Sequence, residues 1–460
     1  MRLRICSGLL RGYRCAHLPE VYRRPQSSSV RPDPLQTPTS EPADHYFEVL
    51  GERFLRDEWT NTSPRLLSLT ERKLHLYRHS PICMIKRRIA DYFSAGYRKR
   101  YGTSPLFTLV DSLPPMVTLW QNFDSLLVPA DHASRRHSDT YYLNRDHCLR
   151  AHTSAHQADL IRSGLDAFLV VGDVYRRDHI DRQHFPAFHQ MEGVRLFSPD
   201  DLFGERIVDD HLRFFEDPSR AGNSRTPEKQ ERLTLEASHL LVHNLKSCLE
   251  GLVDHLFGSD MPRRWTETYF PFTHPSFELE IAPQGVWIEL LGCGVMEQRI
   301  LEECGAGAKV GWAFGLGLDR WCMELYKIPD IRLFWSRDPA FLAQFQTEDY
   351  ASPIEYQPIS PFHPVKFDLS FWLPPAKSPG DPIGFSSSDF LDLVREIGGD
   401  RVEEVTLIDD FLNPKTGRRS HCYRIVYRHM ERPLPRTEVN ELHVEIGRSA
   451  AERFGVELRV

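Results

Sequence analysis

Apolar and polar residues alternate most clearly near the C-terminal end of the chain. Apolar side chains occupy every second position from Val365 to Leu373, with Lys366, Asp368, Ser370 and Trp372 between them. Because successive side chains of a strand point to opposite faces, this alternation predicts a half-buried strand.

The residues after this strand predict a helix, two strands, a second helix and a final strand. Apolar residues recur at helical spacing from Phe390 to Ile397, and Gly398 follows as a stop signal. Strands are predicted at 402–411, 420–430 and 456–460. The second helix is predicted from an apolar face formed by Val439, Leu442, Ile446 and Ala450. The order β-α-β-β-α-β is typical of a ferredoxin-like domain, which we expect at residues 365–460.

A proline-rich segment separates this domain from the preceding chain. It contains Pro353, Pro358, Pro361 and Pro364. Prolines restrict the residues before them and cannot continue a helix, so the segment 351–364 is predicted to be a linker. Residues 46–350 mix short apolar runs with polar helical segments, and the run 168–172 is apolar without alternation, as in a fully buried strand.

The N-terminal segment has a different composition. Its first 32 residues contain seven arginines and a single acid, Glu20, and three serines follow at 27–29. This arginine-rich, acid-poor bias indicates a mitochondrial transit peptide, which we assign to residues 1–45 together with a disordered leader. A secretory signal fits less well because the apolar stretch from Ile5 to Leu10 is short and interrupted. A disordered basic tail is the remaining alternative.

Overall composition limits the class of protein. At 460 residues the chain is about three times the usual domain length. It is 41% hydrophobic, and no apolar run approaches the roughly 20 residues that span a bilayer, so we expect no membrane association. Because the net charge of -7 repels phosphate, any nucleic-acid surface must be a local basic patch. The 9 cysteines form no CxxC pair, which argues against a disulfide framework or a structural zinc site.

Two segments are candidates for nucleotide chemistry, although P-loop, Rossmann and HExxH motifs are absent. In the first, a buried strand leads to Arg176, a polar loop follows, and a second strand returns with Phe188 and Glu192. Such a hairpin could bind a phosphate on the guanidinium and stack a base on the aromatic ring. An arginine beside further charges is, read alone, more often part of a surface ion pair. The second segment is the glycine-rich turn 311–317, followed by a helix that begins near Leu318.

Together these segments resemble motifs 2 and 3 of the class II aminoacyl-tRNA synthetases, with the motif arginines at Arg176 and Arg320. Further segments are similar to the phenylalanyl-tRNA synthetases, in particular to the single-chain mitochondrial form. They lie at 122–124, 150–154, 175–178, 188–192, 270–272 and 289–294. The resemblance extends from about Tyr46 to the C-terminus. It implies an α+β protein with an antiparallel-sheet catalytic domain at 46–350 and a ferredoxin-like anticodon-binding domain at 365–460.

The resemblance also implies the residues that bind each substrate. Arg176 and Arg320 are the expected catalytic residues. Phenylalanine is expected to contact His152, Ser154, Ala155, His156, Gln157, Gln190, Glu192, Phe270 and Phe272. ATP is expected to contact Arg176, Asp178, Gln183, His184, Phe185, Phe188, Glu289, Phe314 and Arg320. The family's glutamates are shortened here to Asp178 and Asp319. We expect Mg²⁺ to be bound mainly through ATP, without metal ligands on the protein.

The expected activity is that of a phenylalanine-tRNA ligase of the mitochondrial matrix, acting as a monomer. A basic group in the C-terminal domain is the candidate surface for tRNA(Phe): Lys415, Arg418, Arg419, Arg424 and Arg428. Since the activation site lies outside that domain, its removal is expected to spare activation of the amino acid. Two alternatives are a synthetase relative that binds RNA without charging it, and a related ligase that makes an adenylate without charging tRNA. The retained motif residues argue against the first and the basic domain against the second.

Overall fold

The computed structural model describes residues 45–99, 102–204, 212–217, 224–358, 362–374 and 385–459. Residues 1–44 of the predicted presequence lie outside this part of the chain, and so do Pro361 of the predicted linker and Val460 of the last predicted strand. In the described part no helix is long and apolar enough to cross a membrane.

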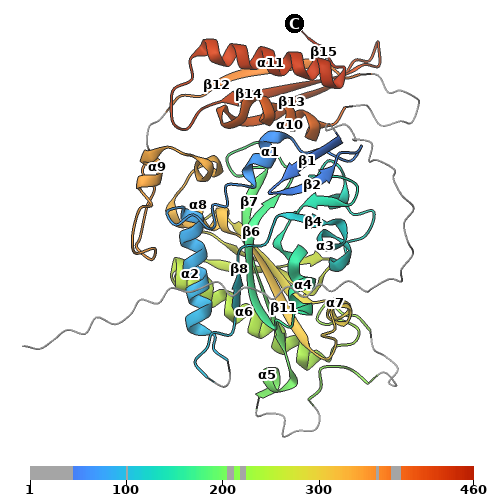
Figure 1. Ribbon diagram of the computed structural model, residues 1–460, viewed down its shortest axis with the longest axis vertical. Helices are drawn as coiled ribbons and strands as arrows, with labels where there is room; N and C mark the ends of the chain where they lie inside the picture. Colours follow the sequence, from blue (N-terminus) through green and yellow to red (C-terminus); the bar gives the residue numbers. More distant parts are fainter. Residues whose placement is uncertain are drawn as a thin grey trace, which may run out of the picture. The chain divides into compact units, whose positions relative to one another are not determined.

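A seven-stranded sheet forms the centre of the larger domain (Figure 1). Its order is β3-β6-β7-β11-β10-β9-β8, and only the β3–β6 pair is parallel. The strands are β3 (Thr108–Val110), β6 (Ala167–Tyr175), β7 (Ala187–Phe197), β8 (Arg263–Phe270), β9 (Thr273–Ile281), β10 (Ile288–Met296) and β11 (Val310–Gly317). Every residue of β6 is buried, which confirms the buried strand that its non-alternating apolar run predicts.

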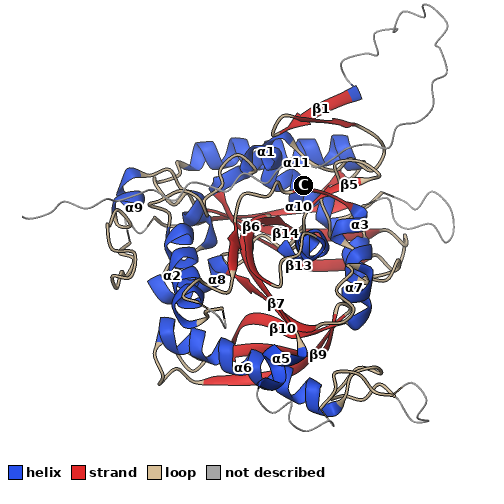
Figure 2. Cartoon of the chain, turned by 60° about the horizontal axis from the view of Figure 1, so that its bottom comes forward, coloured by secondary structure: helices blue, strands red, loops and turns tan. Residues whose placement is uncertain are grey.

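Helices cover both faces of this sheet, as Figure 2 shows for α2 and α8 on one side and α3 and α7 on the other. The first side carries α2 (Pro81–Gly96), α6 (Leu235–Phe257) and α8 (Leu318–Tyr326), whose apolar faces share one core with the sheet. The second core lies against α4 (Gln157–Arg162) and α7 (Gln298–Glu303). Successive β6 residues point alternately into the two cores: Leu169 into the first, Phe168 and Val170 into the second.

Shorter elements complete this domain. Two small sheets pair β1 (Tyr46–Val49) with β2 (Glu52–Leu55) and β4 (Met116–Thr118) with β5 (His147–Leu149). The short helices are α1 (Pro64–Leu69), α3 (Leu119–Asn122), α5 (Pro199–Phe203), α9 (Pro339–Ala343) and the 3-10 turns η4 (Thr153–His156) and η6 (Ile331–Trp335).

The C-terminal domain has the predicted ferredoxin-like order. It contains β12 (Val365–Trp372), α10 (Ser387–Gly398), β13 (Val402–Leu412), β14 (Arg419–Tyr427), α11 (Arg436–Phe454) and β15 (Glu457–Leu458). The sheet order is β13-β14-β12-β15. The alternation in the first strand is confirmed, because Leu369 and Phe371 join the core under the two helices while Asp368 is exposed on the other face. The predicted fold class is therefore correct for both domains.

Candidate active site

A cavity of about 570 Å³ lies over the strands that carry the predicted motif residues. Its lining includes Gln190 and Glu192 of β7 together with Gly315 of β11. These positions continue the sheet face of Val194, because alternate residues of a strand share one face. The cavity brings together eleven of the predicted residues: His152, Ser154, Gln157, Arg176, Asp178, Gln190, Glu192, Phe270, Phe272, Glu289 and Phe314.

The carboxylate of Glu192 is the main charged group on the cavity floor. Its side chain is almost completely buried, and it accepts hydrogen bonds from the hydroxyl of Ser154 and the amide of Gln157. Burial raises the pKa of Glu192 to about 7, although both hydrogen bonds oppose that shift. The site therefore contains a buried carboxylate whose negative charge needs a cationic partner.

Unpaired polar atoms surround this carboxylate. Within the described residues, the side-chain oxygens of Gln157 and Gln190 and the Nδ1 atom of His152 have no hydrogen-bond partner although they are buried. Burial, assisted by the charge of Arg176, lowers the pKa of His152 to about 3, so its imidazole is neutral. Two acceptor oxygens beside Glu192 form a polar surface suited to an ammonium group.

Two aromatic rings form the apolar wall of the cavity. Phe270 and Phe272 stand with their ring centroids 5.7 Å apart and their planes only 11° from parallel. Gly292 allows this arrangement, because a Cβ atom there would lie 2.7 Å from the ring of Phe270. At Gly315 a Cβ atom would lie 2.5 Å from the amide nitrogen of Gln190. The glycines therefore keep open the space between an apolar pocket and the polar floor.

Arg176 forms the opposite wall. Its Nε donates to the carbonyl oxygen of Ala151 at 2.8 Å, which fixes the direction of the side chain, while the guanidinium remains accessible from the cavity. It lies 5.1 Å from the centre of the Phe188 ring. The nearby Arg320 donates to the carbonyl oxygen of Glu289 at 2.9 Å. Of these groups only Arg176 lines the cavity, whereas Arg320 and Phe188 lie just outside the lining, next to Glu289 and Arg176. Two guanidinium groups and an aromatic ring are a combination suited to phosphates and a base.

Other predicted residues do not line this cavity. Ala155 and His156 are buried beneath it, and His156 lies 2.9 Å from Arg150 Nη1. Phe185 lines a separate cavity of about 730 Å³, where its ring stacks on Trp335 with centroids 5.4 Å apart. The amide Gln183 occupies the loop between β6 and β7 without reaching the lining.

His184 belongs to a turn in the same loop that Asp181 organises. Asp181 accepts backbone hydrogen bonds from Gln183 at 2.7 Å and from His184 at 2.8 Å. It also faces the His184 imidazole at 2.7 Å. This contact raises the pKa of His184 and favours its cationic form. The turn therefore presents a histidine whose positive charge is stabilised by Asp181.

Carboxylates gather at the Glu289 end of the cavity. Burial and the charge of Glu289 raise the pKa of Glu278 on the neighbouring strand. Such a pair fits a divalent cation that arrives with ATP, because the cation would offset the mutual repulsion. Among the described residues, no group of three or more histidine, cysteine, aspartate or glutamate side chains could hold a metal ion by itself.

The predicted basic residues of the C-terminal domain are mostly paired with acids. Bidentate or single ion pairs join Arg419 to Asp410, Arg424 to Asp368 and Arg418 to Glu457. Arg428 instead pairs with Glu403, which is buried beside the larger domain. The sequence predicts a basic surface and does not show these ion pairs, because they depend on strand pairing. β12 and β13 bring their aspartates beside the arginines of β14.

This sheet also carries aromatic residues that are not among the predicted tRNA-binding residues. Trp372 lies 6.5 Å from Phe411, ring centre to ring centre, and the guanidinium groups of Arg418 and Arg459 lie 5.0 and 4.8 Å from its ring. Trp372 alternates with the core residue Phe371 and therefore occupies the sheet face away from the helices. That alternation is the signal by which the position could have been found.

Family comparisons agree with both halves of this architecture. The model of tRNA synthetases class II core domain (F) matches residues 101–198 and 229–345, and the model of the ferredoxin-fold anticodon binding domain matches residues 360–459. Fold and motifs together define a class II aminoacyl-tRNA synthetase with an anticodon-binding domain.

Whole-chain relatives narrow this class. The chain is 51% identical over 431 residues to the mitochondrial phenylalanine–tRNA ligase of Mus musculus, covering 94% of this chain and 93% of the relative. It is 50% identical to that of Rattus norvegicus, covering 90% and 89%, and 48% identical to a probable one of Drosophila melanogaster, covering 93% and 94%. The chain therefore belongs to the mitochondrial phenylalanine–tRNA ligases, as its motifs predict, and it is a ligase.

Proposed function

We propose that the cavity around Glu192 and Arg176 activates phenylalanine with ATP and that the chain then transfers the amino acid to mitochondrial tRNA(Phe). The observation that carries this proposal is the pairing, in one cavity, of a buried carboxylate with an accessible guanidinium. An amino acid needs the first for its ammonium group, and a phosphate needs the second.

For phenylalanine, Glu192 would bind the ammonium group together with the free side-chain oxygens of Gln157 and Gln190. The aromatic ring would lie against Phe270 and Phe272. This orientation leaves the substrate carboxylate on the Arg176 side of the cavity.

For ATP, Arg176 would bind the α-phosphate and Phe188 would stack the adenine. Arg320 and His184, whose cationic form Asp181 favours, would bind the outer phosphates. The substrate carboxylate then attacks the α-phosphorus and pyrophosphate leaves. A hydroxyl of the terminal tRNA ribose next attacks the carbonyl carbon of the adenylate, which forms the ester and releases AMP and a proton. Magnesium, bound through ATP beside Glu289, would neutralise phosphate charge. Fixed charges that match the developing transition state supply most of the catalysis.

The remaining parts of the proposal concern location and partners. The mitochondrial relatives support a mitochondrial protein, and we propose the matrix, where tRNA(Phe) is charged for translation, with the chain acting as a monomer. The C-terminal domain would bind the anticodon region through the β12–β14 face.

The direct test is phenylalanine-dependent ATP–pyrophosphate exchange, followed by charging of mitochondrial tRNA(Phe). Arg176→Ala should reduce exchange by about 10²–10³-fold without unfolding the protein, because it removes a charge from an open cleft and leaves no core cavity. Exchange within tenfold of the unmodified protein, or no dependence on phenylalanine, would contradict the proposal.

A further inference from the structure

The loop between β6 and β7, residues 176–186, is attached to the C-terminal domain as well as to the sheet that it leaves. Ile180 is buried and belongs to the hydrophobic core of the C-terminal domain, together with Val405 and Ile425. Its carbonyl oxygen accepts a hydrogen bond from the Val405 backbone N–H at 3.0 Å, so the loop pairs with the edge strand β13. One apolar side chain of the larger domain thus completes the core of the smaller one.

Charged side chains fix the loop on both sides of Ile180. Arg395 of α10 donates to the carbonyl oxygens of Asp178 and of His179, the latter at 2.8 Å. Arg182 pairs at 2.8 Å with Glu403, a carboxylate that is almost fully buried at the start of β13. Because backbone carbonyls accept these bonds from a largely buried arginine, the contacts fix the path of the loop.

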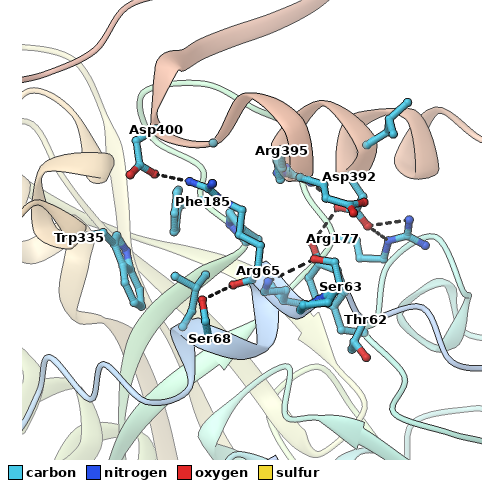
Figure 3. A pocket seen from close by; sticks show the side chains of 18 of the residues that line it. Thr62, Ser63, Arg65, Ser68, Arg177, Phe185, Trp335, Asp392, Arg395 and Asp400 are labelled. Atoms are coloured by element: carbon cyan, nitrogen blue, oxygen red, sulfur yellow. Dashed lines mark hydrogen bonds and ion pairs between the residues drawn. The ribbon is translucent and has the colours of Figure 1, made fainter. Parts of the chain in front are cut away.

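The base of the loop is attached to the same helix. Arg177 donates to Asp392 at 2.8 Å and to Asp389 at 2.6 Å, and its guanidinium is almost inaccessible. Figure 3 shows Arg177 and Arg395 on the two sides of Asp392, at the wall of the 730 Å³ cavity. These ion pairs raise the pKa of Arg177 in spite of its burial. The path of the loop from Arg177 to Arg182 is therefore fixed by the C-terminal domain together with the larger domain, in which Ile331 donates its backbone N–H to the carbonyl oxygen of Arg182 at 2.9 Å.

We propose that the C-terminal domain positions the ATP-binding loop for amino-acid activation, with Ile180 and Arg395 as positioning residues. The inference rests on the proposed function, which assigns Asp178 and His184 on this loop to ATP. Because both lie within a few residues of Ile180, a loop detached from β13 would no longer present them to the phosphates. On this proposal amino-acid activation depends on the C-terminal domain, whereas the sequence predicts that removal of the domain spares activation.

The test uses the full chain and measures pyrophosphate exchange against ATP and, separately, against phenylalanine. Ile180→Ser should raise the KM for ATP about tenfold and Arg395→Gln about fivefold, with the KM for phenylalanine unchanged within twofold. The conservative variant Ile180→Val should leave the KM for ATP at the value of the unmodified protein, since valine retains the apolar contact. Arg453→Gln is the matched control, because Arg453 pairs with Glu396 on the same helix and makes no contact with the loop.

A role in stability alone gives a different result. A protein that is partly unfolded loses active sites, so its apparent kcat falls while both KM values stay constant. Unchanged KM values for ATP in both Ile180→Ser and Arg395→Gln would therefore overturn the inference. Arg176→Ala separates it from the proposed function: if that variant abolishes exchange while the loop variants keep the normal KM for ATP, only the inference fails.

Discussion

Ser154 donates its hydroxyl hydrogen bond to the carboxylate of Glu192, and both side chains are buried at the floor of the cavity. The bond joins η4, where the chain turns before α4, to the middle of β7. A hydroxyl can stabilise a carboxylate, but it cannot neutralise it. Glu192 therefore stays close to protonation until a cationic ligand enters.

Phenylalanine binding should consequently depend on pH. Because the pKa of Glu192 is raised to about 7, the carboxylate is ionised above that pH and protonated below it. Between about pH 8 and about pH 6 the ionised fraction falls roughly tenfold, so the dissociation constant for phenylalanine should rise about tenfold. Binding near pH 6 should also release a proton, since the ammonium group lowers the pKa of its partner.

Isothermal titration calorimetry in buffers with different ionisation enthalpies measures both effects. Glu192→Gln is the control, because its amide does not titrate: it should bind weakly and with no pH dependence over this range. An unmodified protein whose affinity is constant between these pH values would show that Glu192 is not the ammonium partner.

Gly292→Ala should weaken phenylalanine binding selectively. The added methyl group would lie 2.7 Å from the Phe270 ring, so the ring must move into the pocket that it lines. The KM for phenylalanine should rise about tenfold, with the KM for ATP unchanged. Gly96→Ala is the matched control, since a Cβ atom there has nothing within 4 Å. Equal effects of the two substitutions would contradict the proposed place of the ring.

Arg150→Met should destabilise the fold. Arg150 is fully buried and contacts Asp173 through its carboxylate at 3.2 Å and its carbonyl oxygen at 2.7 Å. Removal of the guanidinium leaves a buried carboxylate without its partner, at a cost of about 3–5 kcal/mol. Denaturant unfolding should therefore give a lower midpoint. Arg162→Met, at an exposed ion pair with Asp159, should cost at most about 1 kcal/mol. A loss of the same size at both positions would contradict this interpretation.

Local sequence patterns predict much of this structure. The alternation around Leu369 and the apolar run around Val170 give strands and their buried faces directly, because burial and strand geometry act on neighbouring residues. The cavity residues follow from family motifs. The ion pair between Arg424 and Asp368 cannot be predicted in either way, since it depends on the register of β14 against β12. The burial of Ile180 cannot be predicted either, because its hydrogen-bonded partner Val405 lies 225 residues further along the chain.

Trp372 should contribute more to tRNA binding than the paired arginines around it. Arg424 already has a carboxylate partner in Asp368, so contact with a phosphate must compete with an existing ion pair. Trp372, by contrast, is partly exposed on the outer sheet face, with the guanidinium groups of Arg418 and Arg459 5.0 and 4.8 Å from its ring centre. Its ring is a surface on which an unpaired base can stack.

Stacking of one base contributes about 1–3 kcal/mol, which corresponds to roughly 5- to 150-fold in affinity. Trp372→Ala should raise the KM for tRNA within this range and leave pyrophosphate exchange unchanged, because no residue of the cavity contacts the ring. Val444→Ala provides the control: Val444 is exposed on α11, and α11 packs against the opposite face of the sheet. If both variants bind tRNA as the unmodified protein does, the anticodon lies on a different surface of the domain. If Trp372→Ala also reduces exchange, the residue supports the fold rather than a base.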